Sequence, residues 1–164
     1  MPSLSERTWR SWMNTYKPRK SPGRVVYMFV DELLNYNESE IGIQAVQLLD
    51  KLGYEVRYVP HVDSGRSFLS KGMLKEAPKL AKKNVALFRD IVTKQTPLIG
   101  VEPSAILTFR DEYPDLLRGE EKLAARSIAA HTMLIEEFLS SELDAGQIDI
   151  QLFKDQKKKI KLHG

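Results

Sequence analysis

Cysteine is absent from all 164 residues of the sequence. This absence excludes disulfides, thiolate nucleophiles, zinc fingers and the usual thiolate ligands of iron–sulfur clusters. Long apolar runs are missing as well, because no stretch reaches the roughly 18 residues that span a bilayer and the N-terminus has no apolar signal-peptide core. We therefore expect a soluble, cytoplasmic protein.

A strong excess of charge of one sign is also lacking, since 25 basic residues face 22 acidic ones and the formal net charge is +3. The basic residues are scattered, and this balance is too mild to indicate nucleic-acid binding. No Gly-rich dinucleotide-binding motif occurs, because Gly42 and Gly53 are isolated. The length and the 42% hydrophobic composition suit one globular domain with a real core.

The hydrophobic pattern predicts alternating strands and helices. Residues 25–30 are a β-branched, aromatic-rich run typical of a buried strand, and residues 39–52 place apolar side chains on one helical face before Gly53. A second strand at 54–59 completes a βαβ unit with parallel strands and a right-handed crossover. The pattern then predicts a helix at 72–94 that Pro78 kinks or starts, a strand at 97–101, a helix from Glu102 through Leu117, a helix at 119–143 and a strand at 148–153. We predict an α/β fold, a three-layer domain with a mainly parallel sheet built from βαβ units.

The two ends of the chain differ in composition from this α/β domain, which we place at residues 25–153. Residues 1–24 combine prolines and a glycine with Trp9, Trp12 and Tyr16, so they form a linker or a short helix that docks by its aromatics, and a simple tether is favoured. Residues 154–164 are expected to form a basic turn and the start of a following strand. Their lysines would suit nucleic acid or an anionic membrane surface, but a solvated turn is favoured; they are Lys154, Lys157, Lys158, Lys159 and Lys161.

Polar residues gather in the three loops that follow predicted strands, at residues 31–38, 61–70 and 102–105. Because the carboxyl ends of parallel strands meet at one edge of a sheet, this edge is the candidate site. Its carboxylates, histidine and arginines suit an anion pocket, a divalent metal or a network of ion pairs that braces the loops. Arg66, Lys71 and Arg110 would bind a carboxylate if they faced a common pocket. The candidate pocket comprises Asn35, Tyr36, His61, Arg66, Lys71, Glu102, Ser104, Arg110 and Asp111.

Several motifs follow one another in order along residues 24–140. They include Asp31-Glu32-Leu33-Leu34-Asn35-Tyr36, Leu52-Gly53-Tyr54-Glu55-Val56, Ser64-Gly65-Arg66, Leu69-Ser70-Lys71-Gly72, Val101-Glu102-Pro103-Ser104 and Thr108-Phe109-Arg110-Asp111-Glu112-Tyr113-Pro114. Together they resemble the cysteine-rich, heterodisulfide-reductase-like (CCG-type) domain at the C-terminus of FAD-linked iron–sulfur oxidoreductases, of the D-lactate dehydrogenase and glycolate oxidase type.

The resemblance implies a parent protein that joins a flavin domain, a ferredoxin-like segment and two cysteine-rich repeats, and that oxidises D-lactate or a related 2-hydroxy acid. FAD and [4Fe–4S] clusters are expected in the parent, with no cofactor in this chain. Where the family has cluster cysteines, the matching positions hold Glu32, Asp63, Ser64 and Ala105. Oxygen donors are hard, whereas clusters are normally held by soft thiolates, so cluster binding is expected to be lost.

The same resemblance leads us to expect a domain fragment cut at a repeat boundary, because the chain stops at Leu162-His163-Gly164. We expect a noncatalytic structural or electron-transfer-docking domain whose partners are the other domains of the same polypeptide. Electron-transfer docking at a membrane, with peripheral association of the parent, would fit the family.

An alternative hypothesis makes the edge a small, independent metal-dependent or hydrolytic site that uses His61, Asp63, Glu32 and Glu102. The sequence shows no triplet of nucleophile, base and orienting residue, which disfavours this hypothesis. His131 falls in the apolar pattern of the last long helix and is expected to be a packed structural histidine. Phe109 and Tyr113 are expected to pack the Arg-Asp-Glu-Tyr turn against the sheet.

Overall fold

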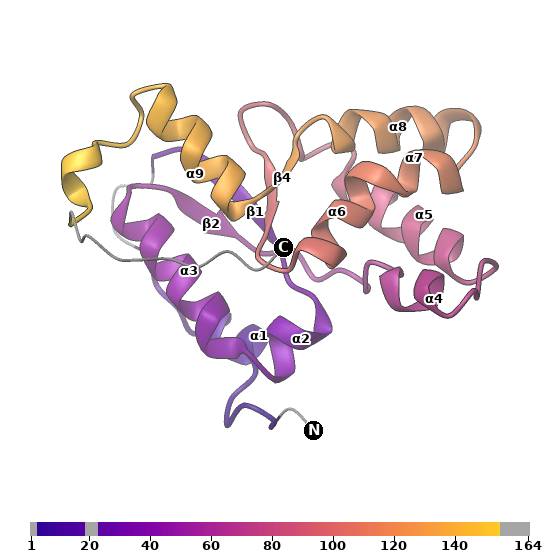
Figure 1. Ribbon diagram of the computed structural model, residues 1–164, viewed down its shortest axis with the longest axis horizontal. Coiled ribbons are helices and arrows are strands. Elements are labelled where there is room, and N and C mark those ends of the chain that lie inside the picture. Colours follow the sequence, from indigo (N-terminus) through magenta and orange to yellow (C-terminus); the bar gives the residue numbers. More distant parts are fainter. Residues whose placement is uncertain (1–2, 19–22, 155–164) are drawn as a thin grey trace, which may run out of the picture.

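A single all-parallel sheet organises the computed structural model, which describes residues 3–18 and 23–154. The sheet has four strands in the order β2-β1-β3-β4, with Val26 level with Val56, Met28 level with Ile99, and Ile99 level with Met133. Helices cover both of its faces (Figure 1), which confirms the predicted three-layer α/β architecture. The strands are β1 (Val25–Phe29), β2 (Glu55–Arg57), β3 (Leu98–Gly100) and β4 (Thr132–Leu134).

One face of the sheet packs against the N-terminal helices and the last α-helix. These are α1 (Trp9–Met13), α2 (Glu32–Tyr36), α3 (Ser39–Lys51) and α9 (Ile135–Asp144). Side chains alternate along a strand, so Val26, Met28 and Val30 point into this core. They meet Val46 of α3 and Phe138 of α9, and all five are buried.

The opposite face packs against the helices between β2 and β4. They are α4 (Arg66–Ser70), α5 (Ala77–Phe88), α6 (Pro103–Asp111), α7 (Tyr113–Leu116) and α8 (Gly119–Ala129). Tyr27 and Phe29 of β1 enter this second core, where Phe29 meets Phe109 edge-on at 4.9 Å between ring centroids. Phe109 and Tyr113 are fully buried beside the sheet, as predicted.

The N-terminal segment is part of the packed domain. Trp9 of α1 is fully buried in the first core, and its indole lies where a Cβ on Gly42 of α3 would have to be. A simple tether is therefore wrong for residues 3–18, because a fully buried tryptophan removes a large apolar area from water. The domain limits at residues 25 and 153 stay a prediction.

The helix predicted at 119–143 is wrong. The chain forms α8, the short strand β4 and α9 instead, and His131 lies just before β4 rather than inside a helix. The strand predicted at 148–153 is also wrong, because Ile150–Leu152 is a single 3₁₀ turn, η1, with Ile150 71% exposed. Alternating apolar residues form a strand only where a neighbouring strand can pair with them.

Smaller differences concern proline and loop positions. Pro78 stands in the first turn of α5, so it marks the beginning of the helix as one of the two alternatives held. The helix expected to reach Leu117 ends at Asp111, and Pro114 starts α7. The loop expected at 61–70 contains α4 from Arg66 onward.

The predicted basic turn lies mostly outside the described residues, since only Lys154 of its lysines is described. The strand expected to start at Ile160 lies outside them as well. Among the helices of the described ranges, none has the length and apolar character needed to cross a membrane.

Candidate functional site

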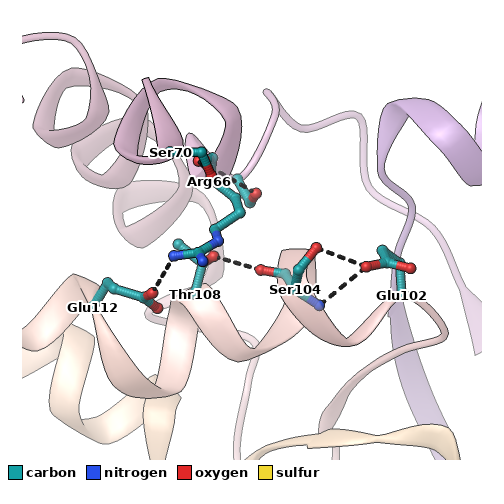
Figure 2. Close-up of polar contacts among 7 residues, drawn as sticks. Arg66, Ser70, Glu102, Ser104, Thr108 and Glu112 are labelled. Carbon is teal, nitrogen blue, oxygen red and sulfur yellow. Dashed lines mark hydrogen bonds and ion pairs between the residues drawn. The ribbon is translucent and has the colours of Figure 1, made fainter. Parts of the chain in front are cut away.

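Two helices begin at the carboxyl edge of the sheet, each capped by an acidic residue. Asp31 follows β1, and its carboxylate accepts hydrogen bonds from the backbone N–H groups of Leu33 (3.1 Å) and Leu34 (3.3 Å). Glu102 follows β3 and accepts from the N–H (3.2 Å) and hydroxyl (2.6 Å) of Ser104, as Figure 2 shows. Burial raises the pKa of Asp31, and the nearby negative charge of Glu102 adds to this effect. The edge loops therefore converge, and these carboxylates are used as helix caps.

His61 is fixed between the strand β1 and its own loop. Its Nε2 accepts the backbone N–H of Val30 at 3.1 Å, and its Nδ1–H donates to the carbonyl of Val62 at 3.0 Å. The ring stacks on Phe29 with 4.2 Å between centroids. Burial lowers the pKa of His61 to about 4, so the ring is neutral near pH 7. Because both ring nitrogens bond to the backbone, His61 has a structural role and no free nitrogen for base or metal chemistry.

Glu32 and Asp63 meet across the first and second loops. Burial raises the pKa of Glu32, and the charge of Asp63 and a side-chain hydrogen bond with it raise it further. Two carboxyl groups this close favour a shared proton over two negative charges. The structure thus brings together two of the four positions matched to cluster cysteines.

The second loop is anchored from below by a buried tyrosine. The hydroxyl of Tyr113 donates to the carbonyl of Ser64 at 2.9 Å and accepts from the side-chain amide of Asn84 at 2.9 Å. The same amide nitrogen donates to the carbonyl of Asp63 at 3.1 Å. Gly65 follows in a left-handed conformation with φ of 85°, which other residues rarely adopt. This network holds Asp63 and Ser64 in place.

The three basic residues of the candidate pocket do not act together. Arg66 forms an ion pair with Glu112 at 2.9 Å (Figure 2), whereas Arg110 pairs with Glu137 of α9 at 3.1 Å and with Asp111 at 3.5 Å. The N–H of Leu134 and the charge of Arg110 lower the pKa of Glu137. Arg66 and Arg110 therefore brace different helix contacts, as the ion-pair alternative expected.

The remaining predicted residues differ in their surroundings. Asn35 is buried, and its side-chain oxygen accepts the backbone N–H of Arg10 at 3.0 Å. Tyr36 is 47% exposed, and Lys71 is an exposed residue that ends α4. Arg10 itself was missed, although its guanidinium contacts the carbonyl of Val30 at 3.4 Å and lies 5.9 Å from the ring centre of Tyr58. Only the aromatic and basic composition of residues 1–24 hinted at this contact.

The donor set at this edge does not fit an iron–sulfur cluster. Ala105 is buried and has no donor atom, and the Ser64 hydroxyl oxygen accepts the N–H of Arg66 at 3.2 Å. Glu32 and Asp63 are hard oxygen donors, and their side chains bond to each other. Within residues 3–18 and 23–154, no group of three or more histidine, aspartate or glutamate side chains is arranged to hold a metal ion.

The fold and this edge define a small parallel α/β domain with an oxygen-lined loop cluster, and the known proteins similar to it include parts of dehydrogenases. Over 122 residues the chain is 30% identical to D-2-hydroxyglutarate dehydrogenase of Escherichia coli K12, covering 74% of the chain and 11% of that protein. Over 150 residues it is 26% identical to a subunit of the anaerobic glycerol-3-phosphate dehydrogenase of the same strain, covering 90% and 37%. Lactate utilization protein A of Macrococcus caseolyticus is 28% identical over 130 residues, covering 77% and 51%.

The chain thus spans only about a tenth to a half of the length of these relatives. No protein-family model matches the sequence, and no solved structure matches it. The similarity therefore concerns one domain of larger oxidoreductases and related proteins.

Proposed function

We propose that the chain is a noncatalytic domain of a larger flavin and iron–sulfur oxidoreductase, with a structural or electron-transfer-docking role. The relatives act, by their names, on D-2-hydroxyglutarate or glycerol 3-phosphate or serve lactate utilization, which supports a 2-hydroxy acid such as D-lactate as the substrate of the parent. FAD and [4Fe–4S] clusters would be bound by other domains and would supply the redox chemistry there. The parent would be cytoplasmic and, through its docking role, peripherally associated with a membrane.

The main support for this proposal is the way in which the cluster-type positions are occupied. Glu32 and Asp63 bond to each other, Ser64 is tied to Arg66 and Tyr113, and Ala105 is packed in the core. Protein groups thus satisfy the loops that a metal would otherwise organise. The domain would act as a rigid support that positions the flavin domain, the ferredoxin-like segment and the second cysteine-rich repeat.

An independent hydrolytic or metal-dependent site has less support. Its base would be His61, whose two ring nitrogens already bond to Val30 and Val62. Burial lowers the pKa of His61 to about 4, which leaves it a weak base at neutral pH.

The proposal is tested by anaerobic reconstitution of the chain with iron and sulfide. We expect a colourless protein without bound iron, measured by absorption, iron and acid-labile sulfide. The control is a variant with all four matching positions changed to cysteine, namely Glu32→Cys, Asp63→Cys, Ser64→Cys and Ala105→Cys, which should gain iron and absorb visible light. A stoichiometric cluster in the unaltered chain would contradict the proposal.

A second measurement separates folding from metal binding. The midpoint of thermal unfolding should be the same with and without a chelator, because hydrogen bonds rather than a metal hold the loops. A clear fall of the midpoint on chelation would show that the edge binds a metal, and it would favour the alternative hypothesis.

A further inference from the structure

The largest cavity of the described chain lies at the opposite end of the sheet from the edge loops. It has a volume of about 860 Å³ and opens where β1, β3 and β4 begin, beside Val25, Pro97 and His131. Ligand cavities of proteins commonly measure about 300–1,000 Å³. Open parallel sheets usually bind ligands at their carboxyl ends, so the position of this cavity is not a general property of the fold.

The wall between the sheet and α9 is held by a set of specific contacts. The hydroxyl of Tyr54 donates to the carboxylate of Glu142 on α9 at 2.6 Å, and Arg24 forms an ion pair with the same carboxylate. The guanidinium of Arg24 lies 5.6 Å from the ring centre of Tyr54, and this ring meets Phe138 edge-on at 5.0 Å. These contacts fix α9 beside the sheet and keep the cavity walls apart.

The lining combines an apolar surface with one unpaired cation. Val26, Pro97, Met133 and Phe138 supply apolar atoms that would contact the body of a ligand. At the rim, Arg24 is neutralised by Glu142, whereas exposed Lys94 has no ion pair within the described part of the chain. The free charge at the rim is therefore positive and belongs to Lys94.

We propose that this cavity binds a small amphipathic organic anion, such as an aryl carboxylate or sulfonate. The apolar body would lie on Met133 and Phe138, and the acidic group would face the ammonium group of Lys94. This site is separate from the edge loops and does not depend on the proposed function of the domain.

The probe for the test is anilinonaphthalene sulfonate, whose fluorescence rises in apolar surroundings, with uncharged N-phenylnaphthylamine as its counterpart. We expect saturable one-to-one binding of the sulfonate to the chain. Lys94→Gln should weaken it about fivefold and leave the uncharged probe unaffected, since one partly exposed charge pair is lost. Ala130→Phe should weaken both probes about tenfold or more by filling the cavity from an exposed lining position.

The matched control is Lys83→Gln, which removes an exposed lysine of α5 that does not line the cavity. It should leave both affinities unchanged, and near-ultraviolet circular dichroism should confirm that each variant is folded. Non-saturable binding, equal effects of Lys94→Gln and Lys83→Gln, or unchanged binding in folded Ala130→Phe would overturn the proposal.

Discussion

Replacing Tyr113 by phenylalanine removes the anchor of the second loop without changing the ring. The hydroxyl is the donor to the Ser64 carbonyl and the acceptor for the Asn84 amide, both at 2.9 Å, and Tyr113 is fully buried. The variant leaves a buried carbonyl without this donor and weakens the satisfaction of Asn84, whose Oδ1 already has no partner among the described residues. Because each buried group left without a partner costs about 1–3 kcal/mol, we expect a loss of about 2–4 kcal/mol in unfolding free energy.

Urea denaturation measures this loss, with the slope of free energy against urea expected to stay unchanged. Hydrogen exchange should speed up at the backbone N–H of Arg66, which bonds to the Ser64 hydroxyl, because the loop opens more often. The Tyr113→Phe and Asn84→Ala losses should add up to more than the loss in the double variant, by roughly 1 kcal/mol, since both remove the same hydrogen bond.

The matched control is Tyr36→Phe, because the Tyr36 ring is 47% exposed. Its unfolding free energy should change by less than about 0.5 kcal/mol. If Tyr113→Phe lost no more than this control, the hydroxyl would not anchor the loop and the reasoning would be refuted.

Two further predictions concern pH. The pKa of His61 is about 4 in the folded state against an ordinary 6.5, so the unfolded state binds more protons between these values, and the His61 contribution to stability should fall as pH drops from about 6.5 to 4. Urea melts across this range should show a weaker pH dependence in His61→Gln, and equal dependence would contradict the prediction. The raised pKa of Glu32 has the opposite sign, because its contribution is largest at low pH and is lost as pH rises through the folded pKa. Glu32→Gln should therefore stabilise the chain at pH 7.5, by up to about 0.5 kcal/mol for this exposed pair, with no gain at pH 3.

The first three strands and the convergence of their loops could be predicted from the sequence, because their signals are local. Residues 25–30 form a strongly apolar run, and Gly53, with φ of 91°, ends the helix before β2. A run of this kind followed by an amphipathic helix and a second run predicts parallel strands whatever the rest of the chain does.

The fourth strand could not be predicted, because Thr132–Leu134 is only three residues long. Glu137 accepts the backbone N–H of Leu134 at 2.9 Å, so α9 starts directly at the end of β4, and no loop residues separate the two. The apolar pattern therefore continues from α8 into α9 and imitates one long helix.

The chemistry of the candidate site was predicted by residue type but not by partner. His61 lies at the edge as expected, but a sequence does not show that its two nitrogens end on the backbone of Val30 and Val62. Arg66 and Arg110 are both near α6, yet they point to different carboxylates, Glu112 and Glu137. These pairings depend on side-chain directions that residue spacing alone does not fix.

The hydrogen bonds from Tyr113 and Asn84 to the second loop have a consequence for how a cell would make this protein. A domain that needs a metal to complete its fold waits for that metal, and its yield follows the supply. Here Asp63 and Ser64 are held by tyrosine and asparagine side chains that are present as soon as the chain is made. Under iron starvation this domain would still fold, and it would offer a finished surface on which iron-dependent parts of a larger enzyme could assemble later.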